Sequence, residues 1–316
     1  MWSNCNAHRI FILSCISVMS YISCLDAPHD NPYDPDNPNR ASLSGIAYEL
    51  GLYPVEGAQV CLMQQGEIVK EETSNVQGVI ELEDIVPGIY DINGSLFHYS
   101  SVSYQSESLW AGQYSVNYRI EFTTLEFDDD VAGTSSPHRF IPLSGSWLVT
   151  EDIQQPEMHS IPHVYTITNS SIVDSAIALC ECEAENFLFE TKIKIDTTSG
   201  DNWRVGVVFR YQDANDFYLL VLSPETTYCD VVVEGQLTHL QAKARAVTPG
   251  NWHRLRVERP YGWITIAIKL NNLVLFAVYD DIFSGGRIGL LSYNYEDTTT
   301  TTVHFDDVTV DLTHGH

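Results

Sequence analysis

Three carboxylates recur at every second position of the segment Glu181-Cys182-Glu183-Ala184-Glu185. Side chains of a β-strand alternate between its two faces, so this spacing places Glu181, Glu183 and Glu185 on one face. Two such carboxylates could act as nucleophile and acid in retaining glycoside hydrolysis, which needs carboxyl groups about 5–5.5 Å apart. The same charges could instead be solvated at a sheet edge, where they discourage strand-to-strand association. We favour the second interpretation and keep the three residues as alternative catalytic candidates.

A second set of residues has the chemistry of sugar binding, in which aromatic faces stack on C–H patches and polar groups hydrogen-bond hydroxyls. Along residues 205–210, alternation directs Val205, Val207 and Phe209 to the core and Arg210 to the opposite face. Aromatic residues surround this strand. The predicted ligand contacts are Trp203, Arg210, Tyr211, Tyr218 and Tyr293. Core packing is the competing interpretation for Tyr218, and it is the expected role of Trp147 and Trp252.

Metal and thiol chemistry have fewer candidates. Asp306 and Asp307 could contribute to a structural calcium site, whereas Asp128–Asp130 lacks the alternating ligands of a calcium loop and is expected to be a solvated linker. No cofactor motif and no CxxC pair of the metal-binding kind occurs. Cys180 and Cys182 would face the same side of a strand, where either could approach Cys229. Buried thiols and one disulfide among these three and Cys61 both remain open.

The composition limits the classes of partner. The 316 residues include 16 Lys+Arg against 42 Asp+Glu, for a formal net charge of −26, and 44% are hydrophobic. The apolar content is that of a folded protein, and a chain of this length commonly forms two domains of about 100–200 residues. Because Lys and Arg supply the affinity for phosphates, nucleic acid is excluded as the expected partner.

The N-terminus has the pattern of an export signal. The apolar run from Ile10 to Ile22 spans about 13 residues, which is too short to cross roughly 30 Å of hydrocarbon as a helix. It ends at Ser23-Cys24 and is followed by a segment rich in Pro and Asp, residues 24–40, which favours an extended tether. The arrangement resembles a bacterial lipoprotein signal, which implies lipidation of Cys24 and a place in the cell envelope, at the outer surface or in the periplasm. An ordinary cleaved signal is the alternative.

Short strand-like segments separated by Gly and Pro turns run from residue 41 to 127 and predict a small β-sandwich. The turns resemble those of the carboxypeptidase regulatory-like family, which has a transthyretin- or immunoglobulin-like fold. This resemblance implies a spacer or binding module. It rests on residues 45–47, 54–60, 73–78 and 82–90.

Strand patterns resume after a polar linker at residues 128–136. Residues 264–270 and 273–278 predict a hairpin around Asn271-Asn272, a dipeptide that tolerates positive φ. The ordered motifs resemble the concanavalin A-like, laminin G-like jelly-roll superfamily, and are closest to 3-keto-disaccharide hydrolase domains and fructan-binding carbohydrate modules. They lie at residues 145–147, 187–190, 205–218, 250–257, 285–290 and 305–310. That superfamily contains lectins, adhesins and hydrolases alike, so the fold does not decide the function.

These features together predict an all-β chain, with a small Ig-like or prealbumin-like sandwich followed by a larger concanavalin A-like jelly roll. The expected order is a signal peptide (1–23), a tether (24–40), the small sandwich (41–127), a linker (128–136), the jelly roll (137–312) and a tail (313–316). We expect a membrane-anchored, non-catalytic lipoprotein whose jelly roll binds carbohydrate for polysaccharide capture or adhesion. A glycoside hydrolase or 3-keto-glycoside lyase is the alternative, and an architectural or protein-adhesion component is the third.

Overall fold

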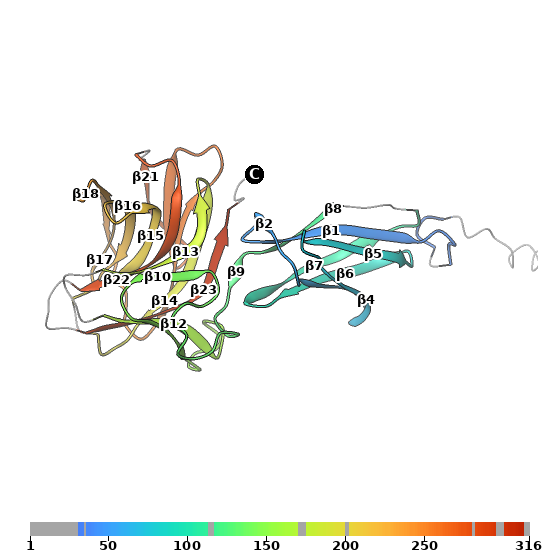
Figure 1. Cartoon of the computed structure of the whole chain (residues 1–316), viewed down its shortest axis with the longest axis horizontal. Coiled ribbons are helices and arrows are strands. Elements are labelled where there is room, and N and C mark those ends of the chain that lie inside the picture. Colours follow the sequence, from blue (N-terminus) through green and yellow to red (C-terminus); the bar gives the residue numbers. More distant parts are fainter. Residues whose placement is uncertain are drawn as a thin grey trace, which may run out of the picture.

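The computed structural model describes residues 31–34, 36–112, 117–169, 175–199, 202–279, 282–294 and 300–312, and these ranges contain strands and no α-helix. Two β-sandwiches lie side by side along the long axis of the molecule, the smaller one N-terminal and the larger one C-terminal (Figure 1). This arrangement confirms the predicted fold class. The expected signal peptide, its Cys24 and the tail at 313–316 lie outside the described residues.

The smaller sandwich packs two sheets around an aliphatic and aromatic core. One sheet contains β1 (Ala41–Glu49), β2 (Tyr53–Pro54), β5 (Val79–Ile85) and β8 (Asn117–Phe122). The other contains β3 (Gln59–Gln64), β4 (Glu67–Thr73), β6 (Gly88–Leu96) and β7 (Tyr99–Leu109). Strand β1 alternates strictly between buried and half-buried positions, as a strand with one face on a core does. Its membership of the carboxypeptidase regulatory-like family stays a prediction.

The larger sandwich also has two sheets. The first, called the seven-stranded sheet below, has the order β10 (Phe140–Ser144), β13 (Ala176–Ala184), β22 (Gly286–Asn294), β15 (Trp203–Asp213), β16 (Asp216–Leu222), β17 (Thr226–Val233) and β18 (Gln236–Ala244). The second, called the β14 sheet, has the order β21 (Leu273–Tyr279), β20 (Thr265–Leu270), β19 (Trp252–Arg259), β14 (Phe187–Ile195), β23 (Thr301–Asp311), β12 (His163–Asn169) and β11 (Trp147–Glu151).

Aromatic side chains fill much of the space between these two sheets. Trp147 is buried there, with its ring centroid 5.0 Å from that of Tyr165, in the packing role predicted for it. The Phe209 and Tyr218 rings stack at 5.2 Å, with only 9° between their planes. Burying such rings contributes a large share of the apolar area removed from water on folding.

The β20–β21 hairpin has the predicted two-residue turn. Asn271 and Asn272 have φ angles of 50° and 65°, in the left-handed region that Asn tolerates better than most residues. The register pairs Leu270 with Leu273 on either side of the turn. This local prediction is therefore confirmed, and the turn presents both amides at one end of the β14 sheet.

The two sandwiches share hydrogen-bonded contacts. The short strand β9 (Thr124–Leu125) pairs with β23 of the larger sandwich and with β7 of the smaller one. Asp128, expected to lie in a solvated linker, accepts a hydrogen bond from the His163 amide at 3.1 Å, and Asp129 accepts one from the His98 amide at 2.9 Å. These carboxylates therefore hold the chain at the junction between the sandwiches.

Candidate functional site

Two of the predicted ligand contacts lie in the core of the larger sandwich. Trp203 and Tyr218 are each 0% exposed and belong to the cluster of buried residues between the two sheets. Neither ring is presented to a ligand, which corrects the expectation for Trp203 and supports the packing interpretation for Tyr218. The position of Trp203 follows from alternation itself, because it shares a strand face with Val205 and Val207.

Arg210 does not lie on the face opposite the core, because the alternation of β15 breaks immediately before it. Val208 pairs with Gly289 but Tyr211 pairs with Arg287, so β15 carries one extra residue at this point. Arg210 occupies that bulge with a φ of 49°. Its buried guanidinium carbon lies 6.0 Å from the centroid of the Tyr218 ring, on the core side. The expected surface contact is thus a buried cation.

Tyr211 and Tyr293 do lie on the other face of the seven-stranded sheet, where they pack on a second aliphatic cluster. The Tyr293 and Tyr228 hydroxyls are 2.7 Å apart, and burial raises the pKa of both phenols. The Tyr211 ring packs on Phe217 with 5.4 Å between centroids. The aliphatic members of this cluster are Ile177, Leu179, Val208, Leu219, Val221, Val232 and Leu291.

The three carboxylates of the catalytic alternative face solvent. Glu181, Glu183 and Glu185 are exposed, and the intervening Cys182 and Ala184 are buried, as the spacing predicts. Strand β13 is not an edge strand, since it lies between β10 and β22; however, β10 pairs with it only as far as Cys180. Glu181 and Glu183 line an open cleft of about 480 Å³ together with Arg287. None of the four cysteines among the described residues forms a disulfide.

Asp306 and Asp307, the candidate calcium ligands, each form contacts with different side chains of the protein. Asp306 is buried, and its carboxylate lies 3.0 Å from His159 Nδ1 and accepts a hydrogen bond from the Ser160 hydroxyl. Burial raises the pKa of this carboxyl. Asp307, with a φ of 44°, forms an ion pair with Lys192. Within the described ranges, no three His, Cys, Asp or Glu residues come together in a way that could hold a metal ion.

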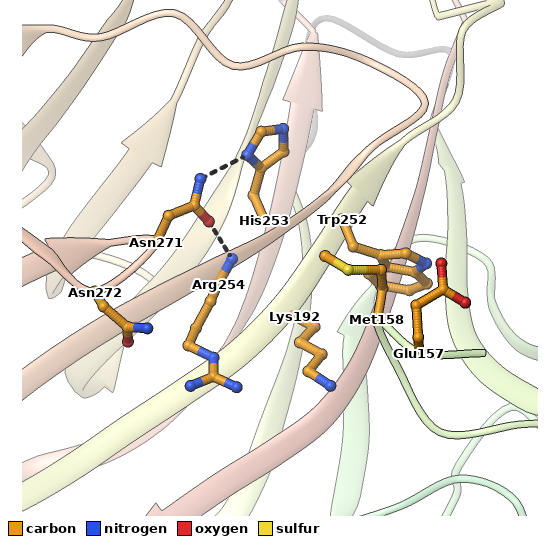
Figure 2. A pocket seen from close by; sticks show the side chains of 8 residues that line it. All are labelled: Glu157, Met158, Lys192, Trp252, His253, Arg254, Asn271 and Asn272. Atoms are coloured by element: carbon orange, nitrogen blue, oxygen red, sulfur yellow. Dashed lines mark hydrogen bonds between the residues drawn. The ribbon is translucent and has the colours of Figure 1, made fainter. Parts of the chain in front are cut away.

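The outer face of the β14 sheet carries a groove that the sequence did not indicate. It has a volume of about 410 Å³, within the usual range of ligand pockets. Strands β14 and β19, the β20–β21 turn and the loop between β11 and β12 all contribute to it (Figure 2). Its lining residues are Glu157, Met158, Lys192, Trp252, His253, Arg254, Asn271 and Asn272.

Strand register explains why the central residues meet. Lys192 of β14 pairs with Arg254 of β19, and Lys194 pairs with Trp252, on the face opposite the core. The centroid of the Trp252 ring lies 4.5 Å from that of the His159 ring and 5.0 Å from the Lys194 ammonium. Its Nε1 is buried, has no hydrogen-bond partner among the described residues, and lies on the Glu157 side of the ring (Figure 2). Trp252 is only 4% exposed, so the packing role predicted for it is confirmed, and the indole forms a fixed base beneath the groove.

The Asn271-Asn272 turn contributes two side-chain amides to the groove, of which one is held by hydrogen bonds and the other is exposed. Asn271 Oδ1 accepts a hydrogen bond from the Arg254 amide at 2.9 Å, and its Nδ2 donates to His253 Nδ1 at 3.2 Å. His253 Nε2 lies 3.1 Å from the Thr248 carbonyl and donates to it, and burial lowers the pKa of this imidazole. These contacts fix Asn271, while the exposed Asn272 extends its amide at the rim of the groove (Figure 2).

The charges around the groove are balanced. Lys192 pairs with Asp307, and Arg254 Nε lies 3.4 Å from the Glu190 carboxylate. A second cavity of about 400 Å³ shares Glu157, Lys192 and Arg254 with the first and extends to Ser100 and Glu126. Paired opposite charges offer donors and acceptors without a strong net field. Such a lining suits a neutral ligand with several polar groups.

Sequence reasoning missed this groove for a physical reason. Residues 250–257 stood out only as a fold motif, and Asn271-Asn272 only as a turn. Lys192 and Glu157 come from two further segments, and only the strand register and the loop bring all of them together. The one local signal was an Asn pair at a turn next to a Trp-containing strand.

Searches with protein-family models and of curated proteins find no match. A search of solved structures does find similar folds, among them the following three. A carbohydrate-binding module, CBM66, from Bacillus subtilis has 17% identity and a TM-score of 0.43, over 55% of this chain and 95% of that one. The cellulose-induced protein Cip1 has 13% identity and a TM-score of 0.41, and the match covers 54% of this chain and 88% of Cip1. A Bacillus subtilis protein of unknown function with a galectin-like fold has 9% identity and a TM-score of 0.40, and the match covers 60% of this chain and 98% of that protein. Similarity at this level assigns neither function nor ligand to this chain.

One further property concerns membranes. No helix in the described part of the chain is both long and apolar enough to cross one.

Proposed function

We propose that the chain binds carbohydrate without catalysis, and that the groove on the outer face of the β14 sheet holds the sugar. The observation that carries the proposal is the combination of side chains in this groove. Met158, which is 43% exposed, offers apolar surface above the buried Trp252, while Asn272, Lys192, Arg254 and Glu157 bring donors and acceptors to the same cavity. A sugar ring has C–H patches and hydroxyls, and therefore needs both kinds of contact.

The pairing of charges supports a neutral sugar and a binding role. Glu190 and Asp307 each face a cation, Arg254 and Lys192, so their carboxylates serve as counter-ions that hold those cations in place. A charged hydrogen-bond donor held in this way loses little conformational freedom when a hydroxyl binds it.

The decisive experiment removes one amide at the rim. Asn272→Gly deletes the side chain but keeps the positive φ that glycine tolerates, so the hairpin is expected to fold as before. We expect a tenfold or greater loss of affinity for a neutral oligosaccharide, measured by isothermal titration calorimetry against inulin, laminarin and xylan fragments. Asn215→Ala, at the exposed β15–β16 turn of the other sheet, is the matched control. Failure of the unaltered chain to bind any of the three would refute the proposal and favour an architectural role.

The proposal also includes the location of the protein. We propose that the chain is an exported bacterial lipoprotein, held in the envelope by a lipid on Cys24 and separated from the membrane by the Pro/Asp-rich segment. The sequence pattern around Ser23-Cys24 supports it. Mass spectrometry of the mature N-terminus is expected to find an acylated Cys24, and Cys24→Ala should release the protein from the membrane fraction.

A second candidate function has one observation in its favour. Glu181 and Glu183 line the open cleft beside Arg287, so the carboxylate pair of a glycoside hydrolase or lyase would be accessible to substrate. Release of reducing sugar that is lost in Glu183→Gln but retained in Asn272→Gly would support this candidate over the first.

A further inference from the structure

A group of large side chains stands out of the larger sandwich at the end of the β20–β21 hairpin opposite its turn. Tyr261, Trp263, Ile264 and Tyr279 are each between 56% and 68% exposed. We call these four residues the aromatic platform. Three of them lie in the loop between β19 and β20, and Tyr279 is the last residue of β21. Exposed rings concentrated in this way usually mark an interaction site.

The loop that carries the platform is held at its base. Arg259, the last residue of β19, donates from Nη1 to the Glu185 carbonyl and to Asn186 Oδ1, both at 3.1 Å. The Trp263 amide donates to the Pro260 carbonyl at 3.1 Å, which closes a turn around Gly262. The φ of 75° at Gly262 is one that glycine adopts without cost. The rings are therefore presented by a preorganised turn, which lowers the entropy cost of binding.

The platform and the groove lie along the same two strands. Ile266 and Val278 face each other in the core, so the neighbouring pair, Thr265 and Tyr279, faces the opposite side, where the groove lies. The Asn271-Asn272 turn at the groove closes the other end of this hairpin. Six residues of β20 separate the two ends, and at roughly 3.3 Å per residue the separation is about 20 Å.

The surface between the two ends is low and carries few large side chains, with Val274 exposed opposite Lys269. Ala267 and Ala277 face each other on it, and their side chains are too short to block a ligand lying along the strands. Lys269 pairs with Glu258 at 2.5 Å, so its charge is neutralised. An extended chain molecule could therefore contact the platform and the groove at the same time.

We propose that the aromatic platform is a second subsite for the carbohydrate bound in the groove, and that the two together select a linear polysaccharide. This inference rests on the proposed function. Tyr and Trp faces stack on the C–H patches of successive sugar rings, and two linked contacts raise the effective concentration at each site. A membrane is the less suitable occupant. Interfacial segments pair aromatic rings with exposed basic residues, whereas Arg259 is only 18% exposed and the chain carries a net charge of −26.

The experiment compares short and long ligands. The double variant Trp263→Ala/Tyr279→Ala of the whole chain is titrated with di- or trisaccharides and with long polymers of inulin, laminarin and xylan. We expect at least a tenfold loss of affinity for the polymer and less than a twofold change for the short sugar. Phe97→Ala/Trp110→Ala, which removes two exposed rings of the smaller sandwich, is the matched control. Thermal unfolding of each variant verifies that it is folded.

Each outcome decides one of the two proposals. Polymer binding that is unchanged in the platform variant overturns the second subsite and leaves the groove intact. Loss of short-sugar binding in the platform variant also overturns it, since the platform would then belong to the primary site. If the platform variant instead loses binding to phosphatidylcholine vesicles and keeps polymer binding, the platform is a lipid contact. If the unaltered chain binds no sugar of either length, the proposed function fails and the second subsite with it.

Discussion

The two sheets of the larger sandwich share one core but differ in their outer faces. On the seven-stranded sheet the face away from the core is aliphatic, and Leu179, Val208 and Leu291 are no more than 1% exposed there. On the β14 sheet the corresponding face carries Glu190, Lys192 and other paired charges around an open groove. One face is therefore closed by its own side chains and the other is available to a ligand.

The burial patterns of individual strands follow this difference. Strand β14 alternates strictly between buried and half-buried residues, whereas β16 runs through five consecutive buried positions from Tyr218 to Leu222. Strict alternation indicates one solvated face, and a continuous apolar run indicates burial on both. The aromatic Tyr218 on the continuous strand therefore packs in the core, whereas Lys192 on the alternating strand lies at the groove.

The contrast between the two outer faces depends first on whether Trp203 belongs to the shared core. Trp203→Ala should lower the free energy of unfolding by about 3–5 kcal/mol, because it removes a fully buried indole and leaves a cavity between the sheets. Urea denaturation monitored by circular dichroism measures this loss. Sugar affinity of the fraction that remains folded should not change. A variant of normal stability with lost affinity would return Trp203 to the ligand-binding set.

Local features of this sandwich could be predicted from the sequence, whereas features that depend on strand register could not. The hairpin at Asn271-Asn272 is a local feature, and its turn chemistry is sufficient to predict it. Arg210 could not be placed, because one extra residue in β15 reverses the alternation on which the prediction depended. The groove could not be assembled either, since Glu157 and Lys192 reach Arg254 only through the loop and the register between strands far apart in the sequence.

A second prediction concerns the acid stability of the β14 sheet. Burial lowers the pKa of His304 to about 4, and the neighbouring Lys194 acts in the same direction. The unfolded chain would take up this proton near pH 6.5, before the folded chain does, so stability should fall as the pH drops from about 6.5 to 4. This side chain is half-buried and its Nδ1 lies 2.9 Å from the Thr166 hydroxyl, so we expect its contribution to be on the order of 2–3 kcal/mol after solvent screening.

Unfolding free energies measured between pH 7 and pH 4 check this prediction. His304→Gln should flatten part of the acid decline, because glutamine stays neutral throughout. Asn215→Ala, at the exposed β15–β16 turn of the seven-stranded sheet, is the control, since it replaces no titratable group. Equal pH slopes in His304→Gln and the unaltered chain would show that His304 does not couple folding to protonation.

A third prediction concerns the aliphatic outer face of the seven-stranded sheet. Tyr293→Phe removes one of two hydroxyls that are 2.7 Å apart and leaves Tyr228 without that partner. A hydrogen bond between neutral groups contributes about 1 kcal/mol, so the free energy of unfolding should fall by about that amount. Because the pair belongs to the cluster that closes the seven-stranded sheet and not to the groove, sugar affinity should stay within twofold of the unaltered chain. Calorimetric titration beside urea denaturation separates the two quantities, and a loss of affinity without a loss of stability would show that this face also contacts the ligand.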